Sequence, residues 1–169
     1  DFAIVATAFG ADLDSIRKPG WVGAMSVILG VVISFIVGTV VAVLFGYMDA
    51  GSISTIGAGA ATYIVSPVTG TALGAESDVI ALSVAAGLVK SELVMIGTPF
   101  VAKSIGLDNP LSAIIYGGPM GAPSGVAGGL AATDPKLVPY GAMTATFYTG
   151  VGFLLAPSPL FMMVRLFTG

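Results

Sequence analysis

Four long stretches of this chain contain no charged residue and consist mainly of apolar side chains. They cover residues 19–48, 50–75, 110–133 and 137–164. Each exceeds the roughly 20 residues that an α-helix needs to cross a hydrocarbon core about 30 Å thick. The pattern predicts an all-α polytopic integral membrane protein.

Three continuous membrane helices are expected, two within these stretches and one in the mainly apolar run between the second and third stretches. Residues 21–45 form the least ambiguous span, and two more helices are expected at residues 79–101 and 137–155. Pro157 and Pro159 then interrupt the last apolar run. Because proline cannot continue the helical hydrogen-bond pattern, we expect the end of the run to form a separate interfacial turn.

Two apolar segments are themselves interrupted by proline and glycine, at residues 56–78 and 112–134. At an offset of 56 residues Pro67 lies opposite Pro123, which indicates an internal repeat; chance similarity between segments rich in small residues is the alternative. A broken helix in a bilayer is tolerated only against protein or water, and it usually marks a transport site.

Each interrupted segment either crosses the membrane completely or enters and leaves it at one face as a re-entrant hairpin. Complete crossing makes the two repeats parallel, whereas re-entry makes them inverted. Re-entry places four positive residues on one side and one on the other, which the positive-inside rule favours over a three-to-two split. The four are Arg17, Lys18, Lys103 and Lys136, and the one is Arg165. Each limb of such a hairpin would have roughly nine to eleven residues and would reach only the middle of the membrane.

The interruptions concentrate hydroxyl side chains and free backbone groups. Unwound carbonyls and hydroxyls suit a hard cation such as Na⁺, and the N-terminus of a half-helix suits an anion. The candidate substrate-binding residues are Ser66, Thr69, Gly70 and Thr71 in the first segment, and Ser124 and Gly125 in the second. Close helix packing is the alternative role for each of them.

Three charged residues also need an explanation. Lys90 lies about 16 Å along its expected helix, close to mid-membrane, where it is either functional and paired or snorkels from a tilted helix. Asp78 and Asp134 are candidate sodium ligands together with Thr69 and Ser124. For the two carboxylates we favour a capping role at the helices that follow them.

Composition narrows the functional classes. The 169 residues have a formal net charge of -3 and a mean hydropathy of +1.00, and no basic tract indicates nucleic acid as a partner. The sequence contains no cysteine and no histidine, so thiol nucleophiles, imidazole bases and the commonest transition-metal ligands are missing. We therefore expect a transport protein with no cofactor beyond a coupling ion, rather than an enzyme. A passive pore and a structural subunit remain as alternatives.

The sequence is similar to the MadM family, the M subunit of the sodium-coupled malonate transporter. The most specific resemblance lies in GLAATDPKLVPYGAMTATFYTG, at residues 129–150. It implies symport of malonate, or a similar short dicarboxylate, with Na⁺ across the bacterial cytoplasmic (inner) membrane, in a heteromeric complex with a smaller L subunit that is also embedded in the lipid bilayer. Under that implication the hydroxyl and glycine candidates bind malonate and Na⁺, and Lys90 offsets a malonate charge.

The resemblance also concerns the N-terminal side of the chain, because M subunits of this family are longer there. We therefore expect residues 1–169 to be a single transmembrane transport domain, the C-terminal part of a longer subunit. Residues 1–18 begin apolar and become charged, as the tail of a preceding membrane helix and a short loop would.

Overall fold

The computed structural model describes residues 20–168, and the regular elements of that range are all helices. α3 (Gly20–Leu44), α6 (Ser77–Val101) and the run Pro135–Thr168 are long and apolar enough to cross a membrane. They confirm the all-α membrane class and the helices expected at residues 21–45 and 79–101. The tail and loop expected at residues 1–18 lie outside the described residues.

The C-terminal run differs from the expected helix followed by a separate turn. It consists of η1 (Pro135–Leu137), α9 (Val138–Leu155), the π-helical turn η2 (Ala156–Leu160) and α10 (Phe161–Thr168). The separate turn is wrong because the two prolines are absorbed within a continuous helical run. A proline ring collides with the preceding turn of an α-helix, and the wider π turn relieves that collision.

The chain divides into two compact units, each containing one helical hairpin. The α4–α5 unit comprises Val31–Lys90 and Thr149–Gly169, and the α7–α8 unit comprises Asp1–Gly30 and Ser91–Tyr148. The dividing points fall inside α3, α6 and α9, so each of these helices contributes one part to each unit.

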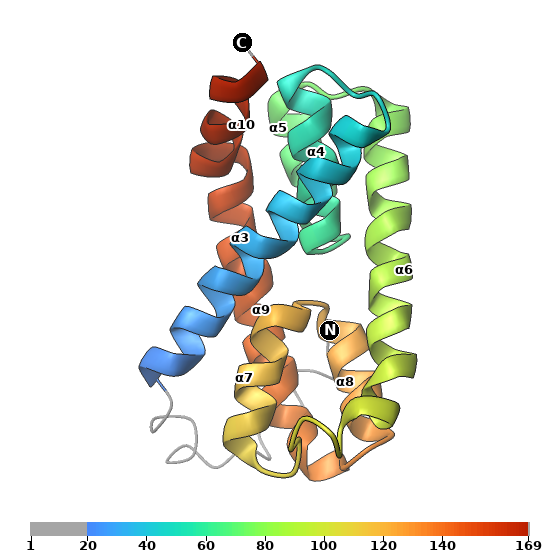
Figure 1. The fold of residues 1–169 in the computed structure, drawn as a ribbon, viewed down its shortest axis with the longest axis vertical. Coiled ribbons are helices and arrows are strands. Elements are labelled where there is room, and N and C mark those ends of the chain that lie inside the picture. The colour runs from blue at the N-terminus through green and yellow to red at the C-terminus, as the bar shows by residue number, and fades with distance from the viewer. Residues whose placement is uncertain (1–19, 169) are drawn as a thin grey trace. The chain divides into compact units, whose positions relative to one another are not determined.

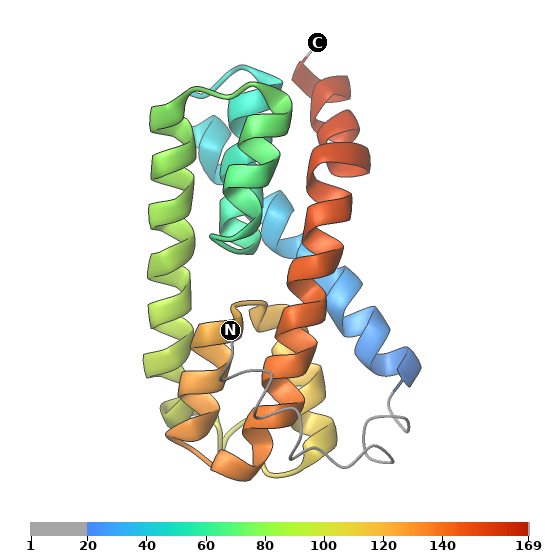
Figure 2. The same ribbon diagram turned by 180° about the vertical axis from the view of Figure 1, so that it is seen from behind.

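The α4–α5 unit holds the first interrupted segment as two short helices. α4 (Ala50–Ala61) and α5 (Val65–Leu73) lie side by side and run in opposite directions (Figure 1 and Figure 2). They contain 12 and 9 residues, about 18 and 14 Å of helix, so neither alone crosses a hydrocarbon core. Residues 62–64 form the break between them.

Asp49 fixes the start of α4. Its Oδ1 atom accepts a hydrogen bond from the Ser52 backbone N–H at 2.7 Å, and this bond lowers the pKa of the Asp49 carboxyl below its usual 3.8. Because the folded-state pKa is depressed, the stabilisation by this cap is present above the unfolded-state pKa. It is lost as the pH falls through the folded-state pKa.

Removal of the Asp49 side chain should weaken the start of α4. We expect Asp49→Ala to lower the free energy of unfolding by about 1 kcal/mol at neutral pH, the usual effect of losing an N-cap. Chemical unfolding of the purified protein in detergent, followed by circular dichroism, measures this difference. Glu76→Ala is the control because it removes an exposed carboxylate near the other end of the same hairpin. Equal losses in the two variants would show that the Asp49 cap contributes nothing.

The second interrupted segment forms the hairpin of the α7–α8 unit. α7 (Pro110–Met120) begins at a capping box made by Asn109, and α8 (Pro123–Ala131) runs back in the opposite direction (Figure 1). Residues 121–122 form the break. The two helices contain 11 and 9 residues, so they too are shorter than a membrane span.

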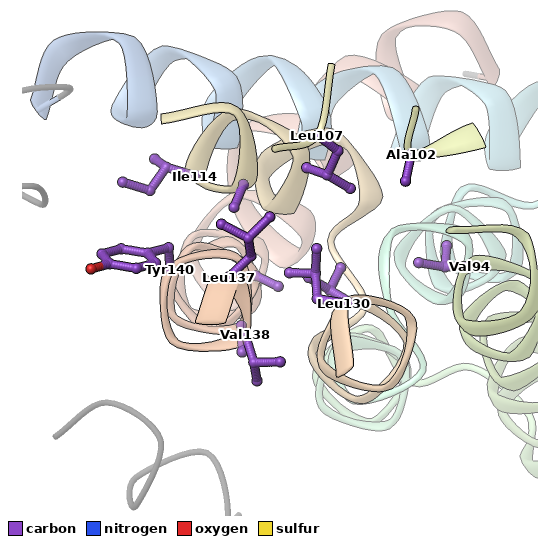
Figure 3. Packing of buried hydrophobic residues seen from close by; sticks show 12 residues of the cluster. Val94, Ala102, Leu107, Ile114, Leu130, Leu137, Val138 and Tyr140 are labelled. Carbon is purple, nitrogen blue, oxygen red and sulfur yellow. The ribbon is translucent and has the colours of Figure 1, made fainter. Parts of the chain in front are cut away.

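Apolar side chains from four elements fill the interior of the α7–α8 unit. Figure 3 shows Ile114 of α7, Leu130 of α8, Leu137 of η1 and Val138 of α9 converging on one cluster. All four are at most 7% exposed. Burial of branched aliphatic side chains, at roughly 1.5–3 kcal/mol each, is what holds this hairpin against its neighbouring helices.

Gly121 allows the tight turn between α7 and α8. Its φ is +61°, in the left-handed region, and a Cβ atom added to it would lie 2.4 Å from the ring of Tyr148. Tyr148 is fully buried, so its ring has little room to move.

Alanine at position 121 should therefore lower the free energy of unfolding by more than the penalty for its left-handed backbone conformation alone. We expect Gly121→Ala to lower the free energy of unfolding by more than about 2 kcal/mol, because the left-handed penalty of roughly 1–2 kcal/mol is joined by the collision with Tyr148. Gly74→Ala is the matched control, since Gly74 has φ +70° with nothing within 4 Å of an added Cβ. Thermal unfolding in detergent compares the two, and equal losses would contradict the role given to the ring.

Two pairs of corresponding helix starts in the hairpin units are separated by a spacing that differs from the expected 56 residues. α5 and α8 begin at Val65 and Pro123, and the following helical runs begin at Ser77 and Pro135, which is an offset of 58 residues in both cases. Pro67 is accordingly the third residue of α5, whereas Pro123 is the first of α8. At the offset of 58, the second residues of the two helices, Ser66 and Ser124, stand opposite each other.

Candidate functional site

Buried hydroxyl groups are concentrated inside the α4–α5 unit. They belong to α4, α5, α6 and the break, and their side chains are at most 6% exposed: Ser52, Ser54, Thr55, Thr62, Ser66, Thr69 and Ser83. A buried hydroxyl without a hydrogen-bond partner costs free energy. The partners of these groups therefore indicate which of them are structural and which have unused binding capacity.

Ser66 belongs to a chain of hydrogen bonds that links α5, α6 and α4. Its Oγ donates to Ser83 Oγ at 2.6 Å, and Ser83 Oγ donates to the Thr55 carbonyl oxygen at 2.6 Å. Gly59 leaves the space for this chain, because a Cβ atom there would lie 2.1 Å from Ser83 Oγ. Both hydroxyl hydrogens are used, whereas the Ser66 oxygen keeps acceptor capacity for a cation or a donor.

Three buried hydroxyls of this unit have no hydrogen-bond partner among the described residues. They are Ser54 Oγ, Thr62 Oγ1 and Thr69 Oγ1. Leaving such a group unsatisfied costs about 1–3 kcal/mol. Sequence reasoning selected Thr69 but missed Ser54 and Thr62. Thr62 could have been found from its place directly before the break, whereas nothing in the sequence distinguishes Ser54 from Ser52.

Lys90 points from α6 toward the break. Its Nζ atom donates to the Ala61 carbonyl at 2.8 Å, to the Ala60 carbonyl at 3.0 Å and to Ser34 Oγ at 3.4 Å. These carbonyls end α4, where the helix dipole presents its negative end. The lysine therefore faces the interior of its unit, and it holds a positive charge within four residues of the start of α5.

The helices that follow the two breaks share an unusual start. α5 and α8 have no side-chain cap, whereas α4 and α7 are capped by Asp49 and Asn109. The first N–H groups of a helix have no partner within the helix, and they carry the positive end of its dipole. Val65 N–H donates to the Thr62 carbonyl at 3.1 Å and Pro123 has no N–H, so the groups left for a carboxylate are the N–H of Ser66 at α5 and those of Ser124 and Gly125 at α8.

In the α7–α8 unit, Ser124 and Gly125 lie against Ser91 of α6. Ser124 Oγ and Ser91 Oγ are 3.0 Å apart, and a Cβ atom on Gly125 would lie 2.4 Å from the Ser91 carbonyl oxygen. Ser91 is buried and Ser124 is exposed at the first turn of α8. The structure thus places both predicted residues, Ser124 and Gly125, against Ser91 within their unit.

The remaining predicted residues lie further from the breaks. Gly70 is buried and packs against Ile80 and Thr55, whereas Thr71 is exposed on α5. Asp78 is exposed in the first turn of α6, and its Oδ1 atom accepts from the Val79 N–H at 2.8 Å.

Asp134 is the N-cap of η1, as the capping interpretation predicted. Its Oδ1 atom accepts from the Lys136 N–H at 3.0 Å. Across the described residues, no three His, Cys, Asp or Glu side chains group as they would around a metal ion. A cation site in the described part of the chain would consequently consist of hydroxyl and carbonyl oxygens, which suit Na⁺ better than a transition metal.

Membrane-length helices with two interrupted hairpins are the architecture expected of a membrane transport protein. The chain belongs to the MadM family: the sequence profile described as "Malonate/sodium symporter MadM subunit" matches residues 1–168. No curated protein and no solved structure shows a significant match to the chain. The family is one of transporter subunits, so the chain is a membrane-embedded component of a multi-subunit transporter.

Proposed function

We propose that the chain takes up malonate, or a similar short dicarboxylate, together with Na⁺ as the M subunit of a secondary transporter in the bacterial cytoplasmic membrane. The smaller L subunit is its partner, and Na⁺ is a coupling ion rather than a cofactor. One observation supports this function above the others: unpartnered buried hydroxyls and a lysine lie at the broken hairpin of a chain whose family profile names malonate and sodium.

The sodium site is proposed at hydroxyl oxygens of the α4–α5 unit. Thr69 Oγ1 is fully buried and has no partner in the described chain, so a cation would satisfy it without breaking an existing bond. Thr62 and Ser54 have the same property and join Thr69 as candidate ligands. Ser124 is a weaker candidate for a sodium ligand, because its hydroxyl already has a hydrogen-bond partner. Asp134 is also a weaker candidate, because its carboxylate caps η1.

The malonate carboxylates are proposed to bind at the uncapped helix starts. In the α4–α5 unit, the Ser66 backbone N–H at the start of α5 and the Thr62 hydroxyl would supply donors, and Lys90, whose ammonium group bonds the Ala60 and Ala61 carbonyls, would add positive charge beside them. Backbone groups at Gly70 and the Thr71 hydroxyl lie further along α5 and complete the predicted set there. In the α7–α8 unit, the N-terminus of α8 supplies the groups of Ser124 and Gly125.

The two hairpins are proposed to be re-entrant and the repeats inverted. Their helices are only 9 to 12 residues long, so each limb would end near the middle of the bilayer. A break near the middle of the bilayer would present polar backbone groups to a substrate that is no longer surrounded by water. A dicarboxylate at that depth needs compensating positive charge. Lys90 and the accompanying Na⁺ would supply it.

Uptake of labelled malonate into vesicles that contain both subunits tests the function. We expect accumulation against the malonate gradient when a Na⁺ gradient is imposed, and none when Na⁺ is replaced by K⁺. Equilibration without uphill accumulation would indicate a passive pore instead. Uptake that needs the L subunit but is unchanged when the breaks are mutated would indicate that this chain has only a structural role.

A further inference from the structure

The ammonium group of Lys90 lies among three oxygen atoms inside the α4–α5 unit. They are the carbonyl oxygens of Ala61 and Ala60, at 2.8 and 3.0 Å from Nζ, and Ser34 Oγ, at 3.4 Å. The two carbonyls end α4, and Ser34 belongs to α3. Oxygen atoms from two different helices therefore hold one positively charged group.

The same three oxygen atoms have the properties of a site for a small free cation. Ala60 and Ala61 are the last two residues of α4, so the negative end of the helix dipole lies at their carbonyls. Carbonyl groups at the end of a broken helix, together with hydroxyl groups, are typical ligands of a coupling ion such as Na⁺. Lys90 thus acts as a tethered cation at a site that suits a free one.

A substrate carboxylate near the break would compete for the lysine. An ammonium group has three N–H bonds, and these three oxygen atoms accept them. Lys90 can therefore donate to a carboxylate only by releasing one of the oxygen atoms. A hydrogen bond between two charged groups is stronger than one to a neutral acceptor, so a carboxylate within reach would displace a neutral oxygen atom. The ammonium group would then leave the negative end of α4.

We propose that the Ala60 and Ala61 carbonyls and Ser34 Oγ form a site for a monovalent cation, which Lys90 occupies in this structure and which Na⁺ occupies once a substrate carboxylate has drawn the lysine away. Malonate and Na⁺ then favour each other's binding, because malonate removes the group that blocks the ion. Without malonate the lysine excludes Na⁺ from the site. This exchange rests on the proposed function, whereas the cation site itself does not depend on malonate.

Removal of the lysine side chain should open the site to Na⁺ in the absence of malonate. The transporter complex is purified in detergent with Thr69→Val, so that the sodium ligand proposed above does not contribute. In this background we expect Lys90→Ala to show a Tm that rises by about 5 °C or more at one hundred times the dissociation constant of Na⁺. Lys103→Ala, in the exposed loop after α6, is the matched control and should show no such rise. A Tm of Lys90→Ala that does not respond to Na⁺ would overturn the proposal.

Methylammonium provides a second probe if Lys90→Ala is unstable during purification. It resembles the end of the lysine side chain and can be added to the buffer as an exchangeable occupant. We expect both methylammonium and Na⁺ to stabilise the variant and to compete with each other. Stabilisation by neither cation, or by methylammonium alone, would reject the sodium site.

The Ser34 hydroxyl tests where the ion binds. We expect Ser34→Ala, added to Lys90→Ala in the same background, to raise the Na⁺ concentration for half-maximal stabilisation about tenfold. Thr39→Val is the matched control, because the Thr39 hydroxyl on the same helix donates to the Ile36 carbonyl at 2.8 Å. Equal Na⁺ responses with and without the Ser34 hydroxyl would contradict the proposed ligand set.

Malonate should open the site when the lysine is present. In Thr69→Val protein that keeps Lys90, we expect little stabilisation by Na⁺ alone and a rise in Tm of about 5 °C or more by Na⁺ in saturating malonate, with chloride at equal ionic strength as the control. A Na⁺ response that malonate does not increase would reject the exchange. Failure of the proposed function would appear differently, as absence of Na⁺-dependent malonate uptake while Lys90→Ala still responds to Na⁺.

Discussion

Replacing Thr69 by valine should make the protein more stable in sodium-free buffer and far less able to use sodium. Valine has nearly the shape of threonine, and it removes a fully buried hydroxyl that has no partner in the described chain. Relief of that unsatisfied group should raise the free energy of unfolding by about 1 kcal/mol. The loss of a ligand to a charged ion should reduce Na⁺-dependent malonate uptake at least about tenfold.

Thermal unfolding at low and high Na⁺ measures the stability and its response to Na⁺, and uptake of labelled malonate measures the loss of transport. An ion that binds only the folded state stabilises it by about 2.7 kcal/mol at one hundred times its dissociation constant, so wild-type protein should gain stability with Na⁺. Thr69→Val should show little of that gain. Thr144→Val is the matched control, because the Thr144 hydroxyl is buried but donates to the Tyr140 carbonyl at 3.0 Å. The control should keep its response to Na⁺.

Opposite signs for stability and uptake distinguish a binding role from a packing role. If Thr69 only packed against neighbouring helices, valine would still relieve the unsatisfied hydroxyl, but it would leave uptake and the response to Na⁺ unchanged. If its hydroxyl had a structural partner, valine would lower both. Only an oxygen reserved for an ion gives a more stable protein that responds less to Na⁺.

The helices were predictable because their causes are local. A charge-free apolar stretch longer than a bilayer fixes α3 to within one residue, a mainly apolar run with two central charges fixes α6 to within two, and proline and glycine locate the two breaks. The capping role of Asp134 was predictable for the same reason, since a carboxylate before a helix has few other local options.

The partners of side chains were not predictable because they depend on packing between helices. Periodicity separates Lys90 from Glu92 by about 200° but does not say which of them faces inward. Only the fold shows that Lys90 reaches the carbonyls at the end of α4. Likewise Ser66 and Thr69 are both hydroxyls on one short helix, yet one is bonded to Ser83 and the other has no partner in the described chain.

The difference between capped and uncapped helix starts connects the fold to the proposed function. Where α4 and α7 begin, Asp49 and Asn109 satisfy the first N–H groups, which is expected of helix ends that serve stability alone. Where α5 and α8 begin, after the breaks, no side chain of the described chain caps them. Pro123, which has no N–H, accounts for part of the uncapped start of α8. The N–H groups that remain at the two starts are the ones that we propose for a malonate carboxylate.

Replacement of Lys90 by methionine should have the largest effect on transport of any single change in the described chain. Methionine keeps much of the length of the side chain but removes the ammonium group that binds the Ala60 and Ala61 carbonyls and places a positive charge beside the start of α5. We expect malonate uptake to fall about a hundredfold, since loss of the charged hydrogen bonds and the positive charge of this half-buried ammonium group costs roughly 3 kcal/mol. Lys103→Met, in the exposed loop after α6, should change uptake less than about twofold.

The kinetics of Lys90→Arg separate substrate binding from support of α4. Arginine keeps the charge and can still bond the α4 carbonyls, but its planar group is larger and directs its donors differently. If Lys90 contacts a malonate carboxylate, the arginine variant should retain most of the thermal stability and show a KM for malonate raised about tenfold or more. If Lys90 serves α4 alone, KM should be unchanged in every variant that folds, and uptake should decline only in proportion to stability. An unchanged malonate KM in Lys90→Arg together with full stability would exclude the lysine from the substrate site.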